Sequence, residues 1–188
     1  MAYTPEGKVA HNAQVAFLAP GSDVHLVPGG FAGPLGYALA SISRADSEGW
    51  FTVAGGGDIQ RVVIVHPSGY AEATLDQLKK DRAVRLGRWA TLEGIWQAKG
   101  QPVTNAEISL QWTRRATVGP ILDSEAFRTV TDAQGHFEFP QVPQGSFQLL
   151  TRFANNPGSA LQKVAEVELL PGEAKQVAIQ EPRTEQGE

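Results

Sequence analysis

The sequence contains one unit twice. The segment ADSEGWFTV from Ala45 aligns with TDAQGHFEF from Thr131, and both share the pattern D-x-x-G-x-F. Upstream, NAQVAF from Asn12 aligns with NAEISL from Asn105. The first pair of segments is offset by 86 residues and the second by 93, so the first copy has an insertion between its two motifs. A period near 90 residues is the length of a small domain and too long for a solenoid repeat. We therefore expect two tandem domains.

Both copies have the pattern of β-strands. Apolar and polar residues alternate in FEF at 137–139 and in ISLQW at 108–112, and turn residues separate such runs. In the repeated motif, we expect Asp46 and Asp132 to open a turn and Gly49 and Gly135 to supply its positive φ. The aromatic residue two positions after each glycine then falls on the core face. Phe51 and Phe137 are thus expected to be equivalent core residues.

One segment, 74–81, has a helical pattern, with Thr74 as its N-cap. Twenty glycines and twelve prolines favour many turns over long helices. We predict an all-β fold of two tandem β-sandwich domains with this one short helix. The predicted domains are residues 1–89 and 90–181, followed by a polar tail, 182–188.

Composition excludes several classes of function. The formal net charge is −4 and no basic stripe dominates, which argues against a nucleic-acid partner. Cysteine is absent, so disulfides and thiolate sites are excluded. The longest apolar run, VVIV at 62–65, is far shorter than the about 20 residues that span a bilayer. The first residues lack the pattern of a signal peptide.

The second copy carries GQPVTNAEISL from Gly100, TVTDAQGHFEF from Thr129 and VPQG from Val142. These motifs closely resemble the carboxypeptidase regulatory-like domain, a transthyretin-like sandwich, over about 90 residues. The resemblance implies that the two tandem β-sandwich domains are prealbumin-like (Ig-like). The first copy resembles the divergent first member of tandem pairs in large bacterial surface or envelope proteins. The resemblance implies a non-catalytic accessory module related in shape to starch-binding domains, and it does not imply peptidase activity.

The residues do not assemble a catalytic or metal-binding motif. Four histidines, at 11, 25, 66 and 136, are scattered singly without metal-ligand spacing. Asp46 and Asp132 are better explained as turn residues than as calcium ligands, because each stands nearly alone. Neither a G-x-S-x-G elbow nor a lysine-bearing phosphate loop is present. We expect no enzyme activity and no cofactor.

Binding is a more open question than catalysis. Trp50, Trp89, Arg114 and Arg115 are the candidate residues for binding loops or an aromatic platform. The loops 20–34 and 114–125 are the longest without a strand pattern, and loops on rigid sandwiches often bind partners. Deleting residues 114–125 is therefore expected to weaken binding and leave the fold intact. The basic residues between Lys79 and Arg88 are interpreted as a solvated face at a helix end; a weak site for an anionic partner is the less favoured alternative.

The favoured function is a structural or interaction module, serving as spacer or docking domains in a larger bacterial envelope or extracellular protein. The alternative is a carbohydrate-binding module that uses surface aromatic residues, which requires two or more exposed, coplanar rings. The expected partner is another protein or a domain of the same parent chain. The expected location, implied by the resemblance, is the periplasm, the cell surface or the extracellular space.

Overall fold

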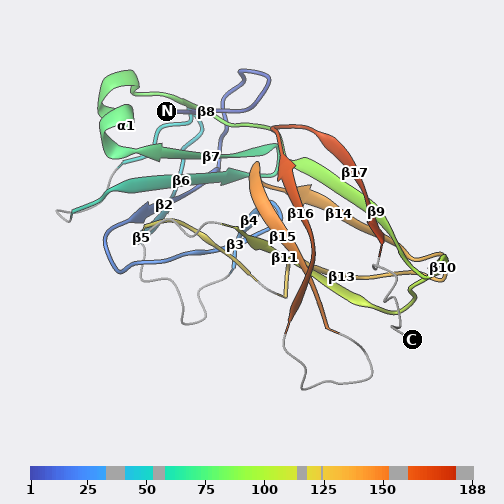
Figure 1. Cartoon of the computed structure of the whole chain (residues 1–188). Coiled ribbons are helices and arrows are strands. Elements are labelled where there is room, and N and C mark those ends of the chain that lie inside the picture. The colour runs from blue at the N-terminus through green and yellow to red at the C-terminus, as the bar shows by residue number, and fades with distance from the viewer. Residues whose placement is uncertain (33–40, 53–57, 114–117, 124, 153–160, 181–188) are drawn as a thin grey trace. The chain divides into compact units, whose positions relative to one another are not determined.

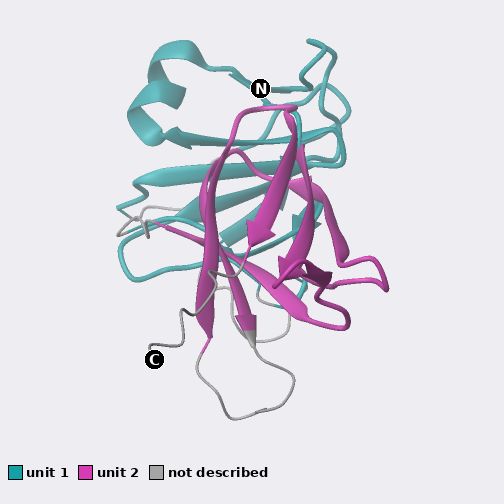
Figure 2. Cartoon of the chain, turned by 45° about the vertical axis from the view of Figure 1, so that its right-hand side comes forward, with its two compact units in different colours: residues 1–89, 114–126 teal, residues 90–113, 127–188 magenta. Residues whose placement is uncertain are grey.

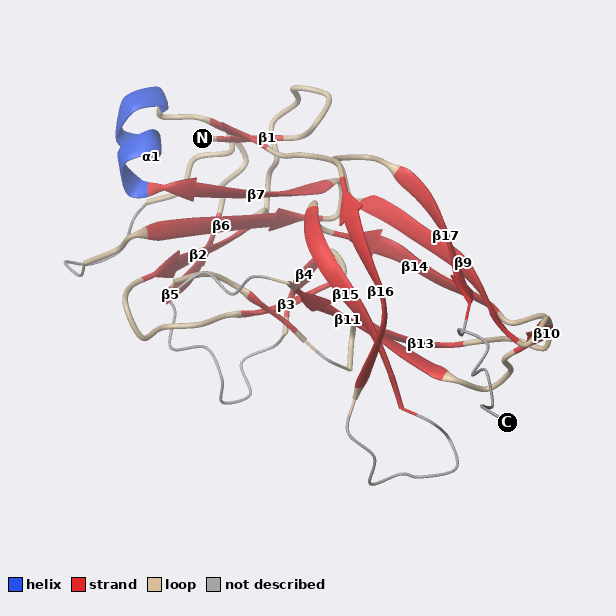
Figure 3. Ribbon diagram, in the orientation of Figure 1, coloured by secondary structure: helices blue, strands red, loops and turns tan. Residues whose placement is uncertain are grey.

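The computed structural model describes residues 1–32, 41–52, 58–113, 118–123, 125–152 and 161–180. Within these ranges the secondary structure consists of strands and a single short helix, which confirms the predicted all-β class (Figure 3). The chain divides into two compact units (Figure 2). Unit 1 comprises residues 1–89 and 114–126, and unit 2 comprises residues 90–113 and 127–188. Residues 114–126 thus belong to unit 1, whereas the sequence places them inside the second domain.

Unit 2 is a sandwich of two four-stranded sheets (Figure 1). In the first sheet, the long strand β9 (Ala90–Ala98) pairs parallel with β17 (Ala174–Gln180) and antiparallel with β14 (His136–Val142) and β10 (Gln101–Pro102). The second sheet has the order β13-β11-β15-β16, with bounds Arg128–Val130, Glu107–Trp112, Gly145–Arg152 and Gln162–Leu169. The apolar side chains that alternate along these strands form the core, with Trp96, Phe137, Phe147, Ile108 and Leu149 at 2% exposure or less.

Unit 1 repeats this strand order in a shorter form. Its main sheet has the order β5-β2-β6-β7, with bounds Ser41–Arg44, Gln14–Leu18, Arg61–His66 and Gly69–Thr74. β1 (Ala2–Tyr3) pairs parallel with β8 (Val84–Arg85), as β9 pairs with β17 in unit 2. Phe17, Ile64 and Leu86 are the largest side chains of the buried cluster of this unit, which also includes Val15 and Val62.

The predicted helix is present as α1 (Leu75–Asp81), between β7 and β8. Thr74 is its N-cap and accepts a hydrogen bond from the Gln77 amide, and the Gln77 side chain accepts one from the Thr74 amide in return. No residue of α1 is fully buried, although Leu78 packs partly against the core cluster. In unit 2 a four-residue turn, 170–173, stands at this position. The helix is therefore an elaboration of the first copy.

The repeated turn is built in the same way in both units. The Asp46 carboxylate accepts hydrogen bonds from the amides of Glu48 and Trp50, both at 2.9 Å. The Asp132 carboxylate accepts hydrogen bonds from the amides of Gln134 and His136, both at 2.8 Å. Gly49 and Gly135 have φ of +80° and +76°. Both aspartates thus use their carboxylates to close a turn.

The two phenylalanines that follow these turns differ in their burial. Phe137 lies on β14 and is 2% exposed. Phe51 is only partly buried; it packs against the unit 1 cluster, and its ring centroid lies 6.4 Å from that of Phe17. Phe51 and Thr52 are not in a strand, and residues 53–57 lie outside the described part. The expected equivalence of the two side chains therefore extends to position but not to burial.

A third sheet in unit 1 is made from the two segments that the sequence presents as long loops. β3 (His25–Val27) and β4 (Gly30–Phe31) form an antiparallel hairpin, and β12 (Ile121–Leu122) pairs parallel with β3. The amides of Ile121 and Asp123 donate to the carbonyls of Val24 and Leu26, both at 2.9 Å. The interpretation of 114–125 as a loop that can be removed without affecting the fold is therefore corrected, because part of it is a strand of unit 1.

Within the described part of the chain, no helix has the length and apolarity needed to cross a membrane.

Candidate functional site

A small group of polar side chains in unit 1 lies at the turn between β6 and β7. The His66 ring lies 6.3 Å from the ring of His11, centroid to centroid, in an edge-to-face arrangement. The Trp89 indole N–H donates to the His66 carbonyl at 3.0 Å, and the Trp89 ring packs against the Tyr70 ring at 5.8 Å. The sequence shows these histidines as isolated residues, because the contact joins positions 55 apart.

The hydrogen bonds of His66 show how this turn uses its imidazole. The Ser68 amide donates to His66 Nδ1 at 3.1 Å, and Ser68 Oγ lies 2.7 Å from the same nitrogen. An amide N–H can only donate, so Nδ1 carries the lone pair and the neutral ring has its proton on Nε2. Partial burial, followed by the nearby His11, lowers the pKa of His66 and favours this neutral form. His66 and Ser68 therefore lock a turn, and Nδ1 is not free to bind a metal.

A second polar group lies along the same hairpin. Tyr70 is 3% exposed, and its hydroxyl donates to the Glu72 carboxylate, which also pairs with Arg61 at 2.7 Å. Burial, then the Glu72 charge, raises the pKa of Tyr70 well above its usual value. The phenol is therefore neutral at physiological pH and acts as a hydrogen-bond donor. This group satisfies a buried hydroxyl and joins the strands β6 and β7.

The predicted aromatic platform is not assembled in the described residues. Trp50 is 48% exposed, Trp89 is partly buried against Tyr70, and Trp96 is fully buried. Trp112 is partly buried and stacks on Phe147 at 5.7 Å. Trp50 is thus the one tryptophan of the described part with an exposed ring, whereas a platform needs at least two. Arg114 and Arg115 lie outside the described residues.

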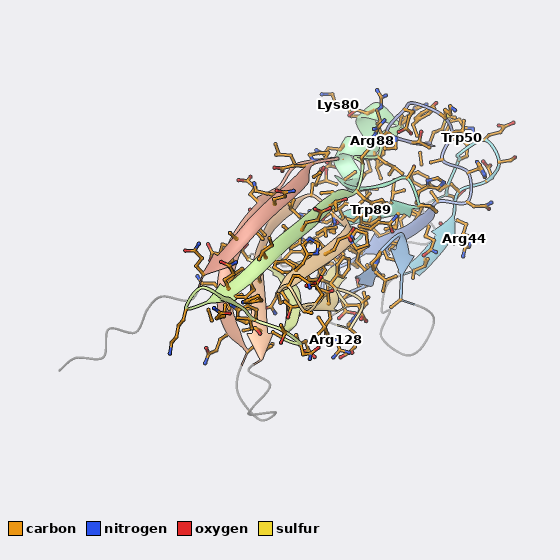
Figure 4. The ribbon with its side chains drawn as sticks, turned by 90° about the vertical axis from the view of Figure 1, so that its right-hand side faces the viewer. Arg44, Trp50, Lys80, Arg88, Trp89 and Arg128 are labelled. Atoms are coloured by element: carbon orange, nitrogen blue, oxygen red, sulfur yellow. The ribbon has the colours of Figure 1, made fainter. Side chains whose placement is uncertain are left out.

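Charge is distributed unevenly over the chain. Five of its sixteen cations lie between positions 79 and 88, where there is one acidic residue. We call Lys79, Lys80, Arg82 and Arg88 the basic end of unit 1. Figure 4 shows Lys80 and Arg88 at the end of the unit that carries α1. Arg88 pairs with Glu6 at 2.9 Å and Lys79 approaches Asp76 at 3.8 Å. These pairs are exposed and contribute little to stability.

The opposite sign prevails on one face of unit 2. Glu93 of β9 and Glu138 of β14 stand directly opposite each other on the outer face of their sheet. Ile95, next on that face, is 46% exposed and stands opposite His136. We call Glu93, Glu138 and Ile95 the acidic face. Like charges directly opposite on neighbouring strands are destabilising, so this pair is unfavourable by itself. The sequence does not show it, because the register of the two strands creates it.

Metal-ligating side chains are dispersed over the described ranges. Among the residues that the structure places, no three histidine or carboxylate side chains come together in a group that could hold a metal ion. His25 and Asp123 approach each other at 3.7 Å, where β3 meets the end of β12. Asp123 also accepts hydrogen bonds from the amides of Glu125 and Ala126 at 3.0 Å. This pair lies beside the backbone pairing of β3 with β12.

Comparisons with known proteins give structural likeness without a family. No protein-family model matches the sequence, and no curated protein matches it. Among solved structures, the minor pilin GBS52 of Streptococcus agalactiae is 13% identical, with a TM-score of 0.45, over 93% of this chain and 84% of that one. A streptococcal ancillary pilin is 11% identical, with a TM-score of 0.43; the match covers 97% of this chain but only 61% of the pilin.

A third solved structure comes from Pseudomonas aeruginosa, and carbohydrate binding has been suggested for that protein. It is 18% identical, with a TM-score of 0.33, over 50% of this chain and 89% of that one. Sequence identities and TM-scores this low are not evidence that these proteins share an activity with this chain.

Proposed function

We propose that the chain is a pair of carboxypeptidase regulatory-like domains that serve as a non-catalytic spacer or docking module in a larger bacterial envelope or extracellular protein. The observation that carries the proposal is the use of the repeated polar residues. In both D-x-x-G motifs, the aspartate carboxylate accepts hydrogen bonds from two backbone amides of its turn. The polar side chains at the β6–β7 turn likewise bond to one another or to the backbone. The polar side chains of these motifs therefore stabilise the fold, as expected of a non-catalytic structural module.

Replacement of the module within its parent protein tests this proposal. An unrelated pair of β-sandwich domains of similar length is substituted for residues 1–188, and surface display and activity of the parent are measured. A spacer predicts that function is retained. A docking role predicts loss of function. Function should then return when the surface residues of the original module are introduced into the replacement domains. Loss accompanied by a turnover activity of the isolated chain would contradict the proposal.

The carbohydrate-binding alternative has one supporting observation, the exposed ring of Trp50. A glycan array probed with the purified chain and with Trp50→Ala tests it directly. Binding that disappears in Trp50→Ala would favour this alternative, because aromatic stacking on a sugar ring depends on that one exposed side chain. Trp112→Phe is the matched control, because Trp112 stacks on Phe147 inside unit 2.

A further inference from the structure

We propose that the basic end of unit 1 binds the acidic face of unit 2 in a second copy of the chain. The inference deepens the proposed docking function by naming the partner, and it rests on that function. It is carried by the separation of charge between the units and by the opposed glutamates of the acidic face.

The separation of charge is the first step. Unit 1 contains ten cationic and ten acidic residues and is neutral overall. Unit 2 contains six cationic and ten acidic residues, so it carries the whole net charge of −4, of which −2 belongs to residues 181–188 outside the described part of the chain. Within neutral unit 1, half of the cations lie between positions 79 and 88. The cations at 79–88 of one copy are therefore complementary in charge to unit 2 of another copy, although unit 1 as a whole is neutral.

The basic end is available for such a contact. Lys79, Lys80, Arg82 and Arg88 are all exposed, and α1 contributes no fully buried residue to its unit. Arg88 already holds a carboxylate, that of Glu6, and both side chains remain exposed. Among the residues that the structure describes, neither Lys80 nor the Arg82 guanidinium forms an ion pair with a carboxylate. The helix, which carries Lys79 and Lys80, stands where unit 2 has only a short turn, so these two charges lie on an element that unit 2 does not have.

The acidic face supplies the complementary chemistry. Glu138 is exposed and Glu93 partly so, and the register places them directly opposite each other. Ammonium or guanidinium groups placed between the two carboxylates would relieve their mutual repulsion. The exposed Ile95 beside them adds apolar surface that a partner can cover.

The contact joins two different surfaces, so it is heterologous. Each copy keeps one surface free after the first contact, and association continues beyond a dimer unless the geometry closes a ring. The Debye length is about 10 Å at 0.1 M salt and shortens as salt is added. The attraction between the exposed charges of the two surfaces, and with it the association, therefore weakens at higher salt. The expected behaviour is growth of the average mass with protein concentration at low salt.

Sedimentation velocity of the full chain tests the proposal at about 20 mM and about 500 mM NaCl, between which the Debye length falls about fivefold. The wild type is expected to associate at low salt and to be monomeric at high salt. The triple variant Lys79→Glu, Lys80→Glu, Arg82→Glu should be monomeric at both, and so should the double variant Glu93→Lys, Glu138→Lys. A matched control keeps the net charge of unit 2 and exchanges the two charges of an exposed ion pair away from the acidic face, with Lys163→Glu and Glu166→Lys combined in one variant. This variant should associate like the wild type.

Mixing the two charge-reversed proteins is the decisive measurement. Each alone repels itself, but together they restore opposite charges at both contacts, so the mixture should associate at low salt. Circular dichroism of each variant checks that it is folded. A wild type that stays monomeric at low salt overturns the proposal, as does association that survives either reversal or a mixture that fails to associate. Because the replacement experiment measures the parent protein, the docking or spacer function can stand even if self-association fails.

Discussion

Gly49 and Gly135 are each required for two reasons at once. Both have positive φ, which side-chain-bearing residues rarely adopt. A Cβ would also meet the Ala2 carbonyl oxygen at 2.8 Å in unit 1 and the Trp96 carbonyl oxygen at 2.4 Å in unit 2. These oxygens belong to the strands that the turn is bonded to, since the amides of Ala2 and Trp96 donate to the carbonyls of Gly49 and Gly135. Each glycine thus allows the positive φ of the turn and the close approach of the turn to the neighbouring strand.

Gly100 offers a control that separates these two reasons, because its φ is +79° but a Cβ there meets nothing within 4 Å. Gly100→Ala should lower the free energy of unfolding by about 1–2 kcal/mol, the cost of the left-handed conformation. Gly135→Ala should cost about 1–3 kcal/mol more, because the strand must shift away from the new methyl group. Urea unfolding of both variants measures the difference. Equal losses would show that the close approach has no energetic consequence.

Phe137 and Phe51 should respond differently to truncation. Phe137→Ala removes a side chain that is 2% exposed and should cost about 3–5 kcal/mol of unfolding free energy. Phe51 is partly buried and packs at the margin of its cluster, so Phe51→Ala should cost less. Hydrogen exchange resolved by peptide assigns each loss to its unit. A loss at Phe51 equal to that at Phe137 would restore the equivalence that the sequence suggests.

His66 should make unit 1 less stable in weak acid. Its folded-state pKa is lowered by partial burial and by His11, so below about pH 6.5 the unfolded chain binds more protons than the folded one. The stability gained from the neutral ring is present above that pH and is lost as the pH falls toward the folded pKa. Unfolding free energy measured from pH 7.5 to 5 should decline in the wild type and be flatter in His66→Gln. A wild-type profile as flat as the variant's would refute the role of His66.

At the scale of elements, the third sheet of unit 1 depends on a strand from far along the sequence. β12 begins 94 positions after the last residue of β3. Leu122 is 8% exposed, and the two amide hydrogen bonds of β12 flank it in the sequence. β12 therefore contributes both backbone pairing and apolar burial to unit 1.

Leu122→Ala should destabilise unit 1 by about 2 kcal/mol or more, since a buried leucine is removed. The amides of Ile121 and Asp123 should lose hydrogen-exchange protection in the same variant, because they bond to the carbonyls of Val24 and Leu26. Leu161→Ala is the control, as Leu161 is 46% exposed. Unchanged protection at both amides would mean that β12 is not a stable strand.

The apolar run of strand β6 indicates that both faces of the strand are buried. Val62, Val63, Ile64 and Val65 are all buried, so both faces of this strand are covered. Val62 and Ile64 face the core cluster, and β4 of the third sheet contacts β6. A continuous apolar run is typical of a strand buried on both faces, whereas one-sided burial gives alternation. The run thus predicts a further layer over the sheet, but not which segment forms it.

At the scale of the whole molecule, local chemistry was readable from the sequence. The repeated motif predicted the turns of Asp46 and Asp132, alternation predicted the strands, and the Thr74 signal predicted the helix. Each of these depends on residues within a few positions of one another, where side-chain geometry and turn preference decide the outcome. The all-β class follows from their sum.

Tertiary structure alone decided the contacts between distant positions. It placed β12 on β3, set His11 beside His66, left Phe51 partly exposed where Phe137 is buried, and put Glu93 opposite Glu138. Each depends on strand register or on the docking of a loop, which arise from the packing of the whole chain. A one-residue change of register would turn the side chains of a strand to the other face, so no local pattern could specify these pairs.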